Sequence, residues 1–312
     1  ADAGPDAPGV ELGPGDDCAL FSADRVAISS DLSLEGVHFR RDWIGPEEIG
    51  YRAAAAALSD LAAMAARPIG ILSSVAVPAG DLPDYAVSLS VGMREAAAEV
   101  GASVLGGDVA RSPGPIVLDV TVVGEATRPV LRSGARVGDA VWVTGRLGGA
   151  AAAVRAWLDG EEPDPKAREA YARPRPRTRE ARWLAERGVP SAMLDLSDGL
   201  AGDLAHLAAA SNVGILLEPE RVPVHPAARE GTASEDDALR VALGGGEDYE
   251  LCFAAPPGAV EEIRTMFEES FAVPLSRVGE VVSGEGVRVR RPDGTIEPVS
   301  IEGFRHFGGD AR

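Results

Sequence analysis

The fold class is decided by residues 46–77, which read PEEIGYRAAAAALSDLAAMAARPIGILSSVAV. Pro46 suits the first turn of a helix, the two glutamates after it complement the helix dipole, and an Arg-Pro pair ends the helix. We therefore expect a helix over 46–66. The apolar run 69–77 that follows is predicted to be a strand. A helix that leads directly into an apolar strand is typical of a domain in which helices pack on a sheet.

The neighbouring segments continue this alternation. A β-prone run occupies 26–29, helical spacing follows at 85–100, and two further strands are predicted at 103–105 and 116–123. The order β-α-β-α-β-β predicts an α/β sandwich whose sheet is covered by helices on one face.

The chain has 312 residues, about twice the usual size of a domain, so we expect two domains. A segment rich in Pro, Gly and Arg at 127–139 marks the boundary, which gives domains 1–130 and 131–312. In the second domain, a stretch rich in proline and charge at 159–182 is predicted to be a long loop. The strands expected there are 140–144, 192–196, 251–254 and 278–282, and the helices are an alanine-rich one ending at Leu158 and one over 200–210.

Composition and charge exclude several classes of protein. Hydrophobic residues make up 45% of the chain, which is ordinary for a globular protein, and 49 acidic residues against 30 basic ones give a net charge of −19. Such a surface repels nucleic acids and anionic membranes. No apolar stretch is long enough to span a membrane, no signal pattern opens the chain, and two distant cysteines make no disulfide framework. We expect a soluble cytoplasmic protein that binds neither nucleic acid nor membrane.

Lys166 is the only lysine in the chain. This excludes the phosphate-binding P-loop and the lysine-dependent protein-kinase type, and it leaves no other residue for a Schiff base. If the protein handles phosphates, it does so with arginine, backbone amides or metal ions.

Aspartates recur at the ends of apolar segments or inside them. Asp31 and Asp108 follow predicted strands, and Asp60 lies within an apolar helix; the same placement holds for Asp16, Asp17, Asp195 and Asp198. Carboxylates in apolar surroundings need a cation or several hydrogen-bond donors, and converging carboxylates suit Mg²⁺. The alternative is that each aspartate caps a helix or turn, as Asp198 would do before Gly199.

The remaining features each have two interpretations. The glycine-rich loop at 145–149 would bind an anion at a helix N-terminus or serve close packing of helix and strand. Gly244–Gly246 would let the backbone approach a ligand or form a plain turn. His38 is expected to be a surface residue or ligand contact, whereas His206 and Cys18 are interpreted as structural.

Seven short motifs run in a fixed order from residue 15 to residue 251, within a stretch of related sequence that covers roughly 13–307. They are GDDCA at 15–19, SSD at 29–31 with EGVHF at 35–39, LSDLAAM at 58–64, GGD at 106–108, RSGA at 132–135 with GD at 138–139, DLSDGL at 195–200, and GGEDYEL at 245–251. Together they resemble the thiamine-monophosphate kinase family, in the superfamily of aminoimidazole ribonucleotide synthetase and selenophosphate synthetase.

The resemblance implies an enzyme that uses ATP to phosphorylate thiamine monophosphate to thiamine diphosphate. It implies a two-domain fold of mixed α/β and α+β class, in which the N-terminal α/β domain binds ATP and metal and pairs with its twin in a homodimer barrel. The C-terminal α+β domain then completes the active site. Direct in-line transfer assisted by several Mg²⁺ ions needs no catalytic side chain from the protein.

The motif positions also imply a role for individual residues. The implied Mg²⁺ ligands are Asp17, Ser29, Ser30, Asp31, Asp60, Asp108, Asp195 and Asp198. The implied ATP contacts are Gly107, Asp108, Arg132 and Ser197, and the implied contacts to thiamine monophosphate are His38, Glu247 and Phe304.

Two other functions stay open at this point. One is another ATP-using member of the superfamily, either the purine cyclo-ligase or a selenophosphate synthetase, although the latter needs a lysine near its reactive cysteine and none accompanies Cys18. The other is a non-catalytic scaffold that binds divalent cations. A thermal-shift assay separates them, because MgATP should stabilise an enzyme, whereas Mg²⁺ alone should suffice for a scaffold.

Overall fold

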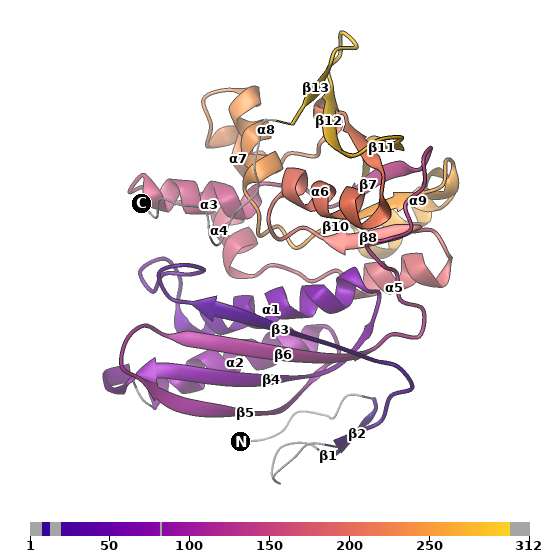
Figure 1. Ribbon diagram of the computed structural model, residues 1–312. Helices are drawn as coiled ribbons and strands as arrows, with labels where there is room; N and C mark the ends of the chain where they lie inside the picture. The colour runs from indigo at the N-terminus through magenta and orange to yellow at the C-terminus, as the bar shows by residue number, and fades with distance from the viewer. Residues whose placement is uncertain (1–7, 13–19, 82, 300–312) are drawn as a thin grey trace. The chain divides into compact units, whose positions relative to one another are not determined.

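The computed structural model describes residues 8–12, 20–81 and 83–299. The chain divides into two compact units, the first made of 1–129 with 172–182 and the second of 130–171 with 183–312 (Figure 1). Each unit contains a sheet with helices packed on it, so the chain has the expected mixed α/β fold in two parts. None of the helices in the described ranges combines the length and the apolar character that a membrane crossing requires.

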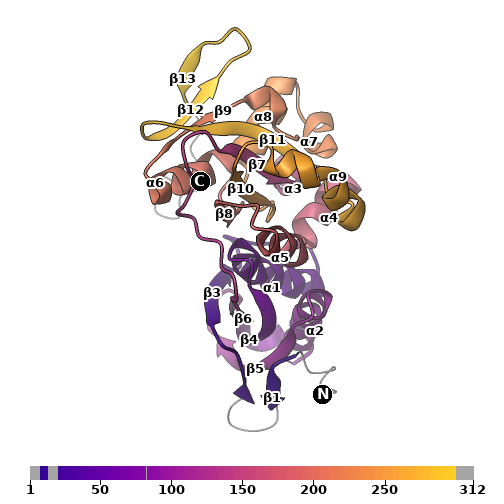
Figure 2. The same ribbon diagram turned by 90° about the vertical axis from the view of Figure 1, so that its right-hand side faces the viewer.

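The first unit is built on a four-stranded sheet in the order β3-β6-β4-β5. Its strands are β3 (Val26–Leu34), β4 (Arg67–Pro78), β5 (Ser103–Ser112) and β6 (Val117–Glu125), and its helices are α1 (Pro46–Ala63) and α2 (Asp84–Glu99). Only β4 and β5 are parallel. Figures 1 and 2 show both helices on the same face of this sheet, which confirms the expected arrangement. A short pair, β1 (Val10–Leu12) with β2 (Leu20–Phe21), and the turn η1 (Ala79–Asp81) complete the unit.

The two helices of this unit touch backbone to backbone. A Cβ atom added at Gly50 would lie 1.9 Å from the Leu89 carbonyl oxygen, and one added at Gly92 would lie 1.8 Å from that of Glu47. Alanines fill the buried side of α1 around the crossing. The small residues of the two helices are therefore the reason that α1 and α2 pack so closely.

The other face of the same sheet carries exposed apolar side chains. In β3, Ile28 is 68% exposed and Leu32 is 53% exposed, and they alternate with inward-facing residues that α1 covers. Isolated exposed apolar residues are ordinary, but several on one strand form a patch that commonly marks an interface.

Two strands extend further than the sequence indicated, so Asp31 and Asp108 lie inside β3 and β5 rather than at their ends. The expected strands ended at Ser29 and at Leu105. In the structure, the pairing of β3 with β6 continues to Leu34 opposite Val117. A polar side chain does not end a strand when the neighbouring strand still supplies its backbone hydrogen bonds.

The second unit is built on a seven-stranded sheet in the order β13-β12-β9-β11-β7-β10-β8. The strands are β7 (Ala140–Thr144), β8 (Ala192–Asp195), β9 (Gly214–Leu217), β10 (Leu251–Ala255), β11 (Leu275–Val282), β12 (Gly286–Arg290) and β13 (Ile296–Pro298). The helices after β7 are α3 (Gly149–Leu158), α4 (Pro165–Ala172), α5 (Thr178–Glu186), α6 (Leu200–Ser211), α7 (Pro226–Glu230), α8 (Glu235–Gly244) and α9 (Ala259–Phe271), with the turn η2 (Pro219–Arg221). Of these, the last residue of α4 and the part of α5 up to Arg182 belong to the first unit. Side chains of α6 and α8 share one apolar core with alternate residues of β7 and β10.

The expectation of a long loop over 159–182 was wrong, because α4 and the first half of α5 lie there. The loop was predicted because the segment is rich in proline. Pro165 is the first residue of α4, where its missing N–H costs nothing, and Pro174 and Pro176 lie between the two helices.

His225 makes the stability of the second unit dependent on pH. Its Nδ1 accepts a hydrogen bond from the Ala227 amide at the start of α7, and burial of the ring, with the charge of Arg146, lowers its pKa from the ordinary 6.5. The unfolded chain therefore takes up the proton first. We expect the contribution of His225 to be complete above pH 6.5 and to be lost as the pH falls through the lowered pKa.

The comparison variant is His225→Asn, which keeps an acceptor for the Ala227 amide and does not titrate. The melting temperature of the wild type should fall relative to that of the variant as the pH is lowered from 6.5 through the lowered pKa of His225. A difference in melting temperature that stays constant from pH 8 to pH 5 would contradict this prediction.

Candidate active site

Three of the predicted metal ligands lie together in the first unit. The Ser29 hydroxyl donates a hydrogen bond of 2.5 Å to Oδ2 of Asp60, which projects from α1. Asp31 is two residues further along β3 and faces the same helix-covered side as Ser29. The structure thus gives Asp60, in its apolar helix, the polar partner that its burial demands.

The structure places Ser30 and Asp108 on the opposite face of this sheet. The Ser30 hydroxyl donates a hydrogen bond of 2.6 Å to Oδ1 of Asp119 in β6. Ser74 of β4 is in register with Asp119 on one side and with Asp108 on the other, so these three side chains share the face that the helices leave open. Asp119 was missed by the sequence analysis, although it is the single charged residue in the predicted strand 116–123.

Gly107 and His38 have clear local roles. A Cβ atom at Gly107 would lie 2.1 Å from the Ser73 carbonyl oxygen, so close approach of β5 to β4 is sufficient to require glycine there. His38 follows β3 and is partly buried, and its Nδ1 accepts the Leu34 amide at 3.1 Å. The neutral ring therefore carries its proton on Nε2, which makes that nitrogen a donor.

In the second unit, Asp203 of α6 accepts hydrogen bonds from the loop between β8 and α6. Its Oδ2 accepts the amides of Ser197 and Asp198, both at 3.1 Å, and Asp195 is buried at the end of β8. The N-cap of α6 is Gly199, without a side-chain cap, so the interpretation of Asp198 as a helix cap was wrong. The amides that Asp203 accepts belong to the loop before the helix, and the position of this acid in the first turn of α6 was the only sequence signal for that role.

Asp203 also belongs to a cluster of possible ligands. Burial, and next the charge of Asp195, raise the pKa of Asp203 to about 7. One ligand atom from each of Asp198, Asp203 and His206 lies within 4.8 Å of the others. His206 is exposed, so the prediction that it is a structural residue on an apolar face was wrong.

The loop 244–250 runs beside the loop after β8. The Glu247 amide donates to the Ser197 carbonyl and the Tyr249 amide to the Leu196 carbonyl, both at 2.8 Å. A Cβ atom at Gly246 would lie 2.6 Å from the Ser197 carbonyl oxygen, which explains the glycine. The structure thus brings the predicted ATP residue Ser197 and the predicted substrate residue Glu247 together.

The N-terminus of α3, which follows the glycine-rich loop considered above as an anion site, binds a carboxyl group of the protein itself. Both carboxylate oxygens of Asp248 accept the Gly148 amide, at 2.8 and 3.1 Å, where α3 begins. Burial raises the pKa of Asp248 well above its ordinary value, while this hydrogen bond acts in the other direction. Close by, the Thr144 hydroxyl donates to Glu250 at 2.5 Å.

Of the remaining predicted residues, Arg132 is exposed, and Asp17 and Phe304 lie outside the described residues. Arg132 is exposed in a loop that Ser211 holds, because the Ser211 hydroxyl donates to the Arg132 carbonyl at 3.0 Å. The predicted ligand Asp17, the neighbouring Asp16 and Cys18, and the predicted contact Phe304 lie outside the described residues.

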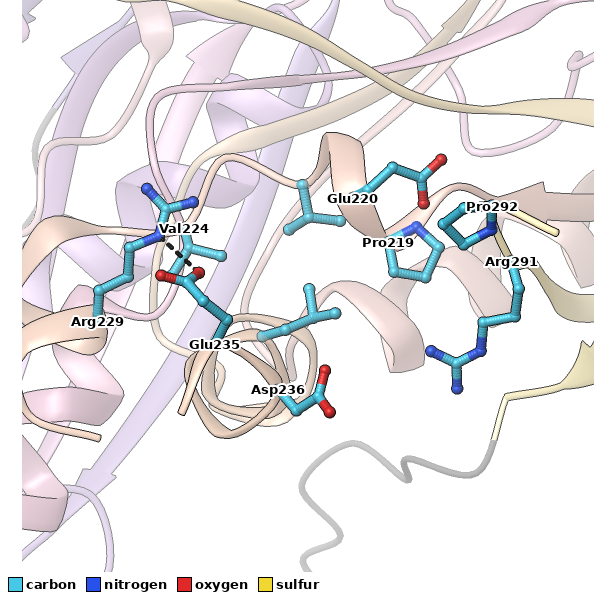
Figure 3. Close-up of a pocket in the computed structure, with 10 residues that line it drawn as sticks. Pro219, Glu220, Val224, Arg229, Glu235, Asp236, Arg291 and Pro292 are labelled. Atoms are coloured by element: carbon cyan, nitrogen blue, oxygen red, sulfur yellow. Dashed lines mark hydrogen bonds and ion pairs between the residues drawn. The ribbon is translucent and has the colours of Figure 1, made fainter. Parts of the chain in front are cut away.

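A pocket of about 370 Å³ lies between η2, α7, α8 and the turn after β12 (Figure 3). Figure 3 shows Arg229 paired with Glu235 at one end and Arg291 at the other. None of the predicted site residues lines this pocket. The candidate residues are therefore the two groups described above, one in each unit.

The two parts of the chain match the two domains of one enzyme class. Residues 15–126 match the family AIR synthase related protein, N-terminal domain, and residues 136–291 match AIR synthase related protein, C-terminal domain. The chain is thus a two-domain member of the AIR synthase related class.

Relatives within this class narrow the assignment. The chain is 35% identical over 310 residues to the thiamine-monophosphate kinase of Rhodopirellula baltica, with 96% of this chain and 92% of the relative covered. It superposes with a TM-score of 0.83 on the thiamine-monophosphate kinase of Stenotrophomonas maltophilia K279a, at 34% identity and 92% coverage of both chains. The structure of AaThiL complexed with AMPPCP and TMP matches at a TM-score of 0.77 and 32% identity, covering 90% of this chain and 87% of the other. The chain belongs to the thiamine-monophosphate kinase family.

Proposed function

We propose that this chain is a thiamine-phosphate kinase, which transfers the γ-phosphate of ATP to thiamine monophosphate and forms thiamine diphosphate. The observation that carries the proposal is the pairing of loop 244–250 with the loop after β8, because it sets Glu247 beside Ser197. Support also comes from relatives named for this activity and from a related structure with an ATP analogue and TMP.

Mg²⁺ fits the donors that the two units offer. Ser29, Asp31 and Asp60 in the first unit present only oxygen atoms, as do Asp195 and Asp198 in the second, and this donor set is the one that Mg²⁺ prefers. The proposed ligands also include Asp17, and Ser30 and Asp108 on the opposite face of the sheet from Ser29 and Asp60. Bound Mg²⁺ would neutralise the phosphate charges, which a chain with one lysine cannot do with amines.

The other proposed roles are binding and orientation. Arg132, Ser197, Gly107 and Asp108 contact ATP, while Glu247 and Phe304 contact thiamine monophosphate. The N–H at Nε2 of His38 is directed by the Nδ1 bond to Leu34, so it can donate to the acceptor phosphate. Transfer is direct and in line, because positioning and charge stabilisation suffice for this chemistry.

The proposal is tested by release of ADP from MgATP with and without thiamine monophosphate. We expect release to depend on the acceptor, thiamine diphosphate to form, and incubation with γ-labelled ATP alone to leave the protein unlabelled. ADP release that does not depend on thiamine monophosphate would favour another ATP-using member of the superfamily. Mg²⁺ binding without any ADP release would favour a cation-binding scaffold.

The working unit in this proposal is a homodimer, joined through the open face of the sheet β3-β6-β4-β5 into a barrel. The first domain, 1–130, binds ATP and metal and dimerises, and the second, 131–312, completes the active site. Ile28 and Leu32 supply the apolar surface that a second copy would cover. The cytoplasmic location expected from the sequence stays a prediction.

We expect light scattering to report a dimer at micromolar concentration and Ile28→Glu to shift it to a monomer. The charge would have to be buried without a partner in the dimer, whereas the monomer leaves it in water. Val137→Glu, at another exposed apolar residue in the loop before β7, is the control and should stay dimeric. A fully active wild-type monomer would refute the proposed assembly.

A further inference from the structure

Loop 244–250 is fixed on two sides. On one side its amides at Glu247 and Tyr249 bond to the carbonyls of Ser197 and Leu196. On the other side the Asp248 carboxylate accepts the Gly148 amide at the N-terminus of α3 with both oxygens. A carboxylate at a helix N-terminus is favoured by the unpaired amides and by the helix dipole. Asp248 therefore ties the loop to a rigid element.

The backbone on either side of Asp248 is strained. Glu247 has φ of 60° and Tyr249 has φ of 50°, which is the left-handed region that residues with a Cβ disfavour. Such conformations persist only where the surroundings over-determine them, and they concentrate at functional sites. Because Asp248 lies between the two strained residues, its bond to α3 is one of the contacts that keep the direction of the Glu247 side chain.

We propose that Asp248 is a positioning residue for the phosphoryl acceptor: by holding loop 244–250 on the start of α3, it sets the place from which Glu247 meets thiamine monophosphate. This inference rests on the proposed function for the role of Glu247. The proposed role of Asp248 concerns the binding of thiamine monophosphate and not the binding of ATP. The amides of Ser197 and Asp198 are held independently by Asp203. The loop that carries the proposed ATP contact Ser197 therefore keeps these two hydrogen bonds when Asp248 is replaced.

A purely structural cap on α3 is the competing explanation. The same unit offers a matched case in Asp164, whose Oδ1 accepts the Lys166 amide at 2.8 Å at the start of α4. Asp164 is exposed and has no contact with loop 244–250 among the described hydrogen bonds. A general loss of capping affects stability in both variants, whereas a positioning role affects the acceptor only when Asp248 is changed.

The experiment compares Asp248→Ala, Asp248→Asn and Asp164→Ala by steady-state kinetics in both substrates. Asp248→Ala should raise KM for thiamine monophosphate about tenfold or more and leave KM for ATP within about twofold, because small displacements of a binding group cost large factors. Asp248→Asn keeps one acceptor for the Gly148 amide and should recover part of the loss. Asp164→Ala should lower the melting temperature and change neither KM.

Several outcomes overturn the inference. It fails if Asp248→Ala only lowers the melting temperature, or if it raises both KM values equally. If Asp248→Ala does not fold, Asp248→Asn carries the test and must raise KM for thiamine monophosphate alone. If the wild type forms no thiamine diphosphate, the proposed function fails and amide hydrogen exchange decides separately on Asp248: faster exchange of the Glu247 and Tyr249 amides in Asp248→Asn supports the tie to α3, and unchanged exchange refutes it.

Discussion

The substitution Asp31→Asn is expected to lower kcat/KM by more than about 100-fold while the protein stays folded. Asparagine has nearly the size of aspartate, so the packing of β3 against α1 is preserved. What is lost is one negative charge beside Ser29 and Asp60, on the helix-covered face of the sheet. If this group holds Mg²⁺, the loss of an anionic ligand lowers the affinity for Mg²⁺ more than it lowers the stability of the fold.

The measurement combines turnover with a readout that does not need turnover. Thermal shift against Mg²⁺ and against MgATP should show weaker stabilisation of Asp31→Asn than of the wild type. Asp24→Asn is the control, since Asp24 is exposed in the turn before β3, and it should be nearly silent. Near-wild-type turnover of Asp31→Asn at saturating Mg²⁺ would refute the assignment of Asp31 as a ligand.

The elements of the first unit could be predicted because their signals are local. Helix α1 begins at Pro46 as expected, and both α1 and strand β4 appear within three residues of the expected bounds. The Arg67-Pro68 pair, expected to end the helix, instead opens β4, and the helix ends earlier, at Ala63. The elements of the second unit were harder to predict from the sequence. Strand β12 reads GVRVR, with too little apolar character to be recognised, and it is stabilised by parallel pairing with β9 across the sheet. Pairing of distant segments overrides local preference.

The site residues could be predicted by type but not by face. Ser29 and Ser30 are adjacent in one motif, yet alternation along β3 sends one hydroxyl to Asp60 and the other to Asp119. The face of Asp108 depends on a shift in register between β4 and β5 after Ile71. Without that irregularity Asp108 would face the helices, because a slip of one residue reverses every side chain. Only the three-dimensional pairing contains this information.

The largest effect on stability is expected from Gly92→Ala. Alanine is the better helix former by about 1 kcal/mol, so propensity alone predicts stabilisation. The added Cβ, however, would lie 1.8 Å from the Glu47 carbonyl oxygen and 2.7 Å from the Tyr51 amide nitrogen, both of them backbone atoms of α1. Neither atom can rotate away, so α1 and α2 must separate, and the contacts between them are lost along the crossing. We expect a loss of about 3 kcal/mol or more in the free energy of unfolding.

Denaturant unfolding measures this loss, with Gly80→Ala as the control, because a Cβ at Gly80 meets nothing within 4 Å and should stay within about 0.5 kcal/mol of the wild type. The reciprocal contact gives a sharper test. A Cβ at Gly50 would lie 1.9 Å from the Leu89 carbonyl oxygen, so Gly50→Ala forces the same separation of the two helices. Once one substitution has moved the helices apart, the second meets less resistance, and the double variant should lose clearly less than the sum of the single losses. Additive losses, or a Gly92→Ala protein as stable as the wild type, would mean that the helices do not share this backbone contact.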